Sequence, residues 1–145
     1  MKCYPGLSLL ICVVLGCSES NPATIEFRLA ETTAGPGLTE MVLDPSGERL
    51  FLHDMVVIDQ NSVSAAVVSM VDGDPSIEVA LTSEGARRFE EWTGINVGEL
   101  CGIVVNGKLV SAPRINAPIR GGRALITGNF TEAEARRIAN GLSGG

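Results

Sequence analysis

The stretch GIVVNGKLV, residues 102–110, is the most informative part of this sequence. Its two apolar runs are separated by Asn106-Gly107. An Asn-Gly pair between apolar runs is the strongest short signal for a β-hairpin, because both residues tolerate the positive φ angles of a tight turn. The stretch therefore predicts two antiparallel strands joined by a two-residue turn.

One helix is predicted on each side of this hairpin. Upstream, Thr82 or Ser83 is expected to cap a helix that runs to about Thr93. Downstream, Thr131 and Glu134 have the spacing of a capping box, in which each side chain bonds the backbone N–H of the other residue. Apolar residues then recur at helical spacing and predict the buried face of the second helix. They are Ala135, Ile138, Ala139 and Leu142.

The remaining residues before the hairpin predict strands. Residues 25–30 alternate apolar and polar side chains, as a half-buried strand does. Strands are also expected at 39–43 and 49–53, joined by a type I turn at 44–47 that has Pro45 at its second position.

A second hairpin is expected from strands at 64–71 and 77–81, although alanines leave a helix open over 63–71. Strands outnumber helices and their connections are short. The chain is therefore predicted to be an α+β domain, with an antiparallel sheet and two helices packed on one face.

The order of these signals resembles the head part of the large periplasmic domain of SecD, a membrane subunit that assists protein export in bacteria. The resemblance runs from residue 77 to residue 142, with a further match of IEFRL at 25–29. The stretches that carry it are VALTSEGARRF (79–89), WTG (92–94), the hairpin, SAPRI (111–115), IRGGRALITG (119–128) and NFTEAEA (129–135). It implies a SecDF P1 head-like domain over residues 25–145, and a role in handling unfolded or translocating polypeptide.

Residues 1–16 have the pattern of a signal peptide, with an apolar run at 7–15. That run is too short to span a bilayer as a helix, which takes about 20 residues. VLGC at 14–17 resembles the lipobox of bacterial lipoproteins, in which the chain is cut before the cysteine and the thiol is joined to diacylglycerol. We therefore expect lipidation at Cys17 and a polar tether at 17–24. The alternative is an ordinary secretory signal with an unrelated cysteine.

The expected anchor places the domain in the cell envelope, facing the periplasm. Ser18 follows the cysteine in place of the aspartate that retains many lipoproteins in the inner membrane, so the outer membrane is favoured in a cell with two membranes. Of the four cysteines, only Cys101 would then keep a free thiol within the domain. Its position in an apolar stretch indicates a small buried side chain.

The chain is acidic, with 11 Lys and Arg against 17 Asp and Glu and a formal net charge of −6. It has no electrostatic reason to bind nucleic acid or an anionic lipid surface. Basic residues concentrate after Cys101, whereas most acidic residues precede it. Either the two halves attract each other in the fold, or Arg114, Arg120 and Arg123 form a cationic rim for an acidic or extended partner.

No catalytic or metal site is expected, and no cofactor. His53 is the only histidine, and Asp54 beside it would point to the opposite face of a strand. We expect His53 to be a polar residue at a strand end. His53 and Cys101 lack the paired spacing of a zinc site. Asp72-Gly73-Asp74 lacks the further ligands of a calcium loop. The glycines at 121, 122 and 128 are interpreted as tight turns or points of close backbone approach.

Residues 113–122 are rich in Pro and Gly and predict an exposed edge, because Pro113 and Pro118 prevent pairing on at least one side. Such an edge accepts an extended peptide as an added strand, through backbone hydrogen bonds that tolerate many sequences. The candidate polypeptide-binding residues are Arg114, Ile115, Ile119 and Arg120. The alternative is an edge that is blocked against aggregation.

Together, these observations predict a non-enzymatic envelope lipoprotein. It would bind polypeptide, or a component of the export machinery, in protein translocation across the membrane. The alternative is a structural or interaction lipoprotein of the envelope with no role in export.

Overall fold

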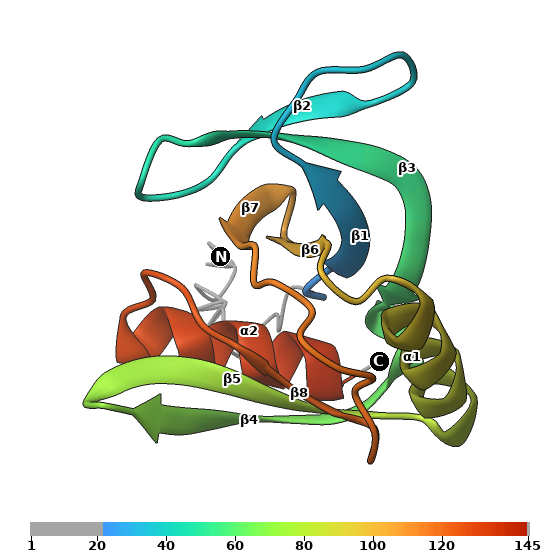
Figure 1. Cartoon of the computed structure of the whole chain (residues 1–145). Helices are drawn as coiled ribbons and strands as arrows, with labels where there is room; N and C mark the ends of the chain where they lie inside the picture. The colour runs from blue at the N-terminus through green and yellow to red at the C-terminus, as the bar shows by residue number, and fades with distance from the viewer. Residues whose placement is uncertain (1–21, 145) are drawn as a thin grey trace, which may run out of the picture.

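The structure is a computed structural model that describes residues 22–144. The predicted signal peptide, Cys17 and most of the predicted tether lie outside the described residues. The described chain forms eight strands, two α-helices and one 3-10 turn (Figure 1). Their order is β1 (Ile25–Glu31), β2 (Thr39–Val42), β3 (Arg49–Asp59), η1 (Gln60–Ser62), β4 (Val63–Val71), β5 (Asp74–Leu81), α1 (Ser83–Ile95), β6 (Leu100–Val105), β7 (Lys108–Ser111), β8 (Arg123–Ile126) and α2 (Glu132–Ser143).

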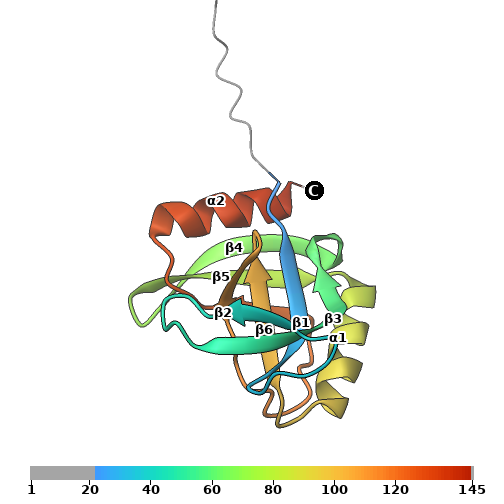
Figure 2. The same ribbon diagram turned by 90° about the horizontal axis from the view of Figure 1, so that it is seen from above.

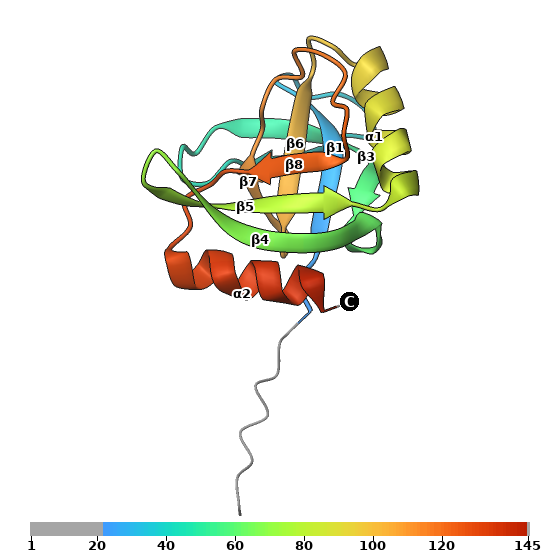
Figure 3. The same cartoon turned by 90° about the horizontal axis from the view of Figure 1, so that it is seen from below.

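The strands form two antiparallel sheets. The larger has the order β2-β3-β1-β6-β7, and the smaller has the order β4-β5-β8. In Figure 1 the larger sheet lies above the smaller one, and Figures 2 and 3 show α2 at the side of the molecule, next to β4. Buried side chains from both sheets and both helices form the main core, which includes Phe27, Ile77, Phe89, Ile103 and Ile126. The predicted α+β class, with antiparallel strands and two helices, is confirmed. The structure adds the division of the strands into two sheets.

Each helix begins where the sequence predicts. The side chain of Thr82 accepts a hydrogen bond from the Gly85 N–H at 3.1 Å and caps α1, which contacts β3 and β5. The capping box of α2 is present, with the Thr131 N–H bonded to Glu134 at 3.0 Å and the Glu134 N–H bonded to Thr131 at 3.1 Å. Helix α2 runs alongside β4, as Figures 2 and 3 both show. Its buried face contains Leu142.

Both predicted hairpins are present. The β6–β7 turn consists of Asn106 and Gly107, whose φ angles are 50° and 81°. The β4–β5 turn consists of Asp72 and Gly73, with φ angles of 51° and 88°. Residues 63–71 form a strand, so the helix left open there is excluded. The two turns confirm that local turn chemistry decides these pairings.

Strand β3 is longer than predicted, and His53 lies in its middle rather than at a strand end. Arg28 pairs with Val56 and Ala30 pairs with Leu52, so residues 53–55 of β3 lie opposite a single residue of β1. Such a bulge increases bending and twist of a strand. Figure 1 shows β3 bending sharply as it passes from β2 to β1.

The predicted type I turn between β2 and β3 is wrong. The Gly47 N–H donates to the Leu43 C=O at 2.8 Å, which closes a five-residue turn, and the Asp44–Pro45 peptide bond is cis. The Asp44 N–H donates to the Leu109 C=O at 3.1 Å. Leu109 lies in β7, far from Asp44 in the sequence. A turn rule that considers only neighbouring residues therefore cannot account for this contact.

Candidate functional site

The Pro/Gly-rich segment is held against the start of β6. The Cys101 N–H donates to the Pro113 C=O, and the Ile115 N–H donates to the Glu99 C=O, both at 2.8 Å. This pairing turns successive side chains to opposite faces. Arg114 is consequently exposed, whereas Ile115 is only 3% exposed and belongs to the main core. The expectation that Ile115 would be available on an exposed edge is therefore wrong.

A pocket of about 400 Å³ lies beside this segment. One side is lined by residues 113–119, and the other by Arg123, Ala124 and Leu125 of β8. The side chains at its floor are almost fully buried and mainly apolar. They are Phe27, Phe89, Cys101, Ile103 and Ile115. The pocket thus lies where the outer strand of the smaller sheet approaches the Pro/Gly-rich segment.

Helix α1 fixes the far end of the segment. The Ile119 N–H donates to the Thr93 hydroxyl at 2.8 Å, and that buried hydroxyl donates to the Phe89 C=O at 2.7 Å. Ile119 is half-buried and packs against the core. Gly122 follows with φ +65°, and a Cβ atom there would lie 2.7 Å from the Cβ of Ala86. The interpretation of this glycine as a point of close approach is confirmed.

The arginines around the pocket are bonded within the chain. The Arg114 guanidinium donates to the Gly98 C=O. Arg120 pairs with Glu90 at 3.3 Å, and Arg123 pairs with Glu78 at 3.0 Å. These two pairs join the basic second half to the acidic first half. They favour mutual attraction of the halves over a free cationic rim, although each exposed pair stabilises the fold only slightly.

Cys101 lies on β6 at the floor of the pocket and is 5% exposed. Desolvation by burial raises the pKa of its thiol to about 12. Because the thiolate is the nucleophilic form, a thiol held protonated in this way is chemically inert near neutral pH. The prediction of a small buried side chain is confirmed.

His53 lies on the β3 bulge, and its Nε2 is 2.6 Å from Glu31 Oε1. Arg28 donates to the His53 C=O at 2.7 Å and lies 3.5 Å from Asp54. Sequence reasoning missed this role of Arg28, since a bulge has no local signal here. His53 does not line the pocket that Cys101 lines, and residues 22–144 contain no group of three His, Cys, Asp or Glu side chains that could hold a metal ion.

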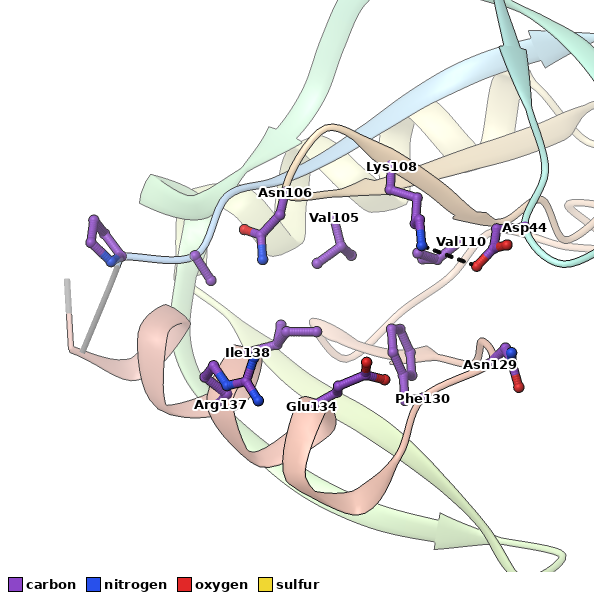
Figure 4. A pocket seen from close by; sticks show the side chains of 12 residues that line it. Asp44, Val105, Asn106, Lys108, Val110, Asn129, Phe130, Glu134, Arg137 and Ile138 are labelled. Carbon is purple, nitrogen blue, oxygen red and sulfur yellow. Dashed lines mark ion pairs between the residues drawn. The ribbon is translucent and has the colours of Figure 1, made fainter. Parts of the chain in front are cut away.

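A larger pocket of about 670 Å³ lies between α2 and the β6–β7 hairpin (Figure 4). Figure 4 shows Phe130 and Ile138 pointing toward Val105 and Val110 across it. Lys108 pairs with Asp44 at 3.3 Å at one end. Its lining comes from four segments far apart in the sequence, so nothing local predicted it.

Residues 38–145 match the family described as SecDF, P1 head subdomain. The chain belongs to this family. The protein translocase subunit SecD of Magnetococcus marinus is 42% identical over 125 residues, which cover 86% of this chain and 23% of that protein. SecD of Acetobacter pasteurianus is 31% identical over 133 residues, covering 85% of this chain and 26% of that protein. The resemblance to SecD read from the sequence is thus confirmed.

The fold agrees with a solved structure of SecDF, which is described as a membrane component that enhances protein export. The TM-score is 0.69 at 25% identity, over 86% of this chain and 63% of that chain. The chain spans only about a quarter of the length of the SecD subunits from Magnetococcus and Acetobacter. Neither α1 nor α2 has the length and apolar character of a membrane-spanning helix.

Proposed function

We propose that this chain is a non-enzymatic lipoprotein of the cell envelope, whose SecD head-like domain binds unfolded or translocating polypeptide or a component of the export machinery. Family membership supports this proposal, because the relatives are named as subunits of a protein translocase. The chain corresponds to a fraction of their length, so the proposal concerns binding by this one domain.

The observation that carries the proposal is the pocket beside residues 113–119, with its apolar floor. Apolar side chains become buried in a folded protein but are exposed in an unfolded chain, and a concave apolar surface can bind them. The loops around this pocket lie at the end of the molecule opposite the start of β1 (Figure 3). A lipid anchor at Cys17 would therefore leave the pocket facing away from the membrane.

The four candidate residues contribute in different ways. Ile119 is half-buried beside the pocket, and Ile115 forms part of its floor. Arg114 and Arg120 are held by Gly98 and Glu90. We infer that shape and apolar surface, rather than net positive charge, would provide most of the affinity.

Site-specific crosslinking in living cells tests the binding role. A photoreactive amino acid at Ile119 is expected to capture many different secreted chains during their export. The matched control is Met55, which is 68% exposed on the β3 bulge and outside the pocket. Capture of one constant partner that does not belong to the export machinery would favour the alternative, an interaction lipoprotein without a role in export. Equal capture from both positions would contradict binding at the pocket.

Fractionation tests the anchor. We expect the natural chain in the membrane fraction, because several acyl chains at about 0.8 kcal/mol per buried methylene hold a protein on a bilayer. Cys17→Ser is expected to release the domain into the periplasm. Cys101→Ser serves as the control and should stay in the membrane fraction. A Cys17→Ser variant that remains with the membrane would show that Cys17 is not the anchor. Separation of the two membranes tests the expected outer-membrane location.

A further inference from the structure

Strand β8 is an outer strand of the smaller sheet, and part of its backbone faces away from β5. The Leu81 N–H donates to the Gly122 C=O at 2.7 Å, just before β8 begins. Hydrogen-bonded and non-bonded pairs alternate along an antiparallel ladder. Arg123 and Leu125, one and three residues further on, therefore belong to non-bonded pairs. The N–H and C=O groups of both residues point away from β5.

These outward groups have no hydrogen-bond partner among residues 22–144. The same two residues line the pocket beside the Pro/Gly-rich segment. A row of free backbone donors and acceptors thus borders an apolar cavity. Two independent features, the outward-facing backbone groups of β8 and the lining of the pocket, thus involve the same residues, Arg123 and Leu125.

We propose that an extended polypeptide segment binds here as an additional strand along β8. Its backbone would pair with Arg123 and Leu125, and one apolar side chain would enter the pocket. This inference rests on the proposed function, since it assumes a polypeptide ligand. The strand edge that binds the peptide is then β8, and not the Pro/Gly-rich segment before it, where the sequence predicted the binding edge.

The chemistry of the site favours an extended polypeptide over other occupants. Unpaired N–H and C=O groups along a strand edge match the alternating groups of another extended backbone. Along β8, Ile126 is buried, whereas Arg123 and Leu125 are exposed, so side chains alternate between the core and solvent. A strand added beside β8 would continue this alternation. The ligand class is therefore a segment with apolar residues at alternate positions and few other sequence requirements.

Amide hydrogen exchange measured by NMR tests this binding mode. The probe is a seven-residue peptide in which valine alternates with threonine between terminal lysines. At saturation, we expect exchange of the Arg123 and Leu125 amides to slow at least tenfold. The Ala124 and Ile126 amides, which face β5, should be protected already in the free protein and serve as the internal control.

Backbone methylation of the peptide provides a second measurement. Two versions carry N-methyl groups on alternate residues, each in the opposite register, with all side chains kept. An added outer strand uses only one of its two sets of amides. Only one of the two versions should therefore lose affinity, by at least tenfold. Equal affinities for the two versions would overturn strand addition.

The outcomes separate this inference from the proposed function. If the peptide shifts the methyl signals of Ile115 and Ile119 but leaves the Arg123 and Leu125 amides unprotected, polypeptide binding stands and strand addition fails. If neither the peptide nor a chemically unfolded secreted protein binds, both fail. Protection that appears without peptide and rises with protein concentration would assign the edge to a second copy, and would also overturn the inference.

Discussion

Strands β4 and β8 are the two outer strands of the same three-stranded sheet, but different parts of the chain lie beside them. Helix α2 runs alongside β4 (Figures 2 and 3). The Ser143 hydroxyl accepts from the Ala66 N–H and donates to the Ala66 C=O, both at 3.0 Å. On β8, the outward groups of Arg123 and Leu125 have no hydrogen-bond partner within residues 22–144, and they lie beside a pocket.

Unpaired strand edges promote association with other chains, and folded proteins usually block them. Helix α2 blocks the β4 edge at Ala66, and we call this the covered edge. The edge of β8 beside the pocket is the open edge, and the proposed binding of an extended segment would use it. Substitutions at the covered edge, at the entry to the open edge and in the pocket next to it test this difference.

The largest effect is expected from Leu142→Ala. Leu142 is 3% exposed and anchors the last turn of α2 in the core. Removal of a buried leucine side chain costs about 2–5 kcal/mol, because contacts are lost and a cavity remains. We expect the free energy of unfolding in urea to fall by this amount, and light scattering to show self-association as the β4 edge is uncovered.

Arg136→Ala is the matched control on the same helix. Arg136 pairs with Glu132 at 2.7 Å, and both side chains are largely exposed. Such a pair contributes about 0.3–0.5 kcal/mol. If Leu142→Ala were no more destabilising than Arg136→Ala, packing of α2 would not be what covers β4.

A pair of glycine variants tests how α1 positions the entry to β8. Gly121 and Gly122 both have positive φ angles, so alanine at either position costs about 1–2 kcal/mol. Only at Gly122 would the new Cβ meet another atom, the Ala86 Cβ at 2.7 Å; at Gly121 the space is open. We expect Gly122→Ala to lower the free energy of unfolding by about 1–3 kcal/mol more than Gly121→Ala does. Equal losses would show that α1 and β8 can separate freely.

The two elements that meet at the covered edge were largely predictable from the sequence, because local rules apply to each of them, whereas their contact was not predicted. The Thr131 and Glu134 capping box, the apolar spacing up to Leu142 and the turn between β4 and β5 each depend on residues close together in the chain. The structure contains all three of these predicted features. These are places where local preference and tertiary packing agree.

The candidate site was only partly predictable, because it forms between distant segments. The Pro/Gly-rich composition located one wall, but the sequence could not show that Ile115 pairs with Glu99 and faces the core. The β3 bulge that carries His53 depends in the same way on its register with β1. Proline and glycine indicate where pairing stops, whereas the position of the free edge depends on which strands become neighbours.

A smaller effect is expected from Ser143→Ala at the covered edge. The variant leaves the backbone groups of Ala66 without their side-chain partner. A hydrogen bond of this kind contributes about 0.5–1.5 kcal/mol. We expect a loss in that range, together with faster hydrogen exchange at the Ala66 amide. Ser143→Thr keeps a hydroxyl and should retain slow exchange; if Ser143→Ala also retains it, the cover does not depend on this hydroxyl.

The smallest effect at neutral pH, and a distinct one in alkali, is expected from Cys101→Ala at the pocket floor. Burial raises the pKa of the Cys101 thiol to about 12 in the folded chain, from an ordinary value of 9.0. The folded state keeps a proton that the unfolded state releases as the pH rises. The contribution of the thiol to the free energy of unfolding is therefore fully present below about pH 9 and is lost toward pH 12. Between these values the free energy of unfolding changes by about −1.4 kcal/mol per pH unit. Urea unfolding at pH 7.5, 9.5 and 10.5 should show a steeper alkaline loss for the natural chain than for Cys101→Ala. Parallel profiles would mean that the thiol at the floor of the pocket is not shielded from water.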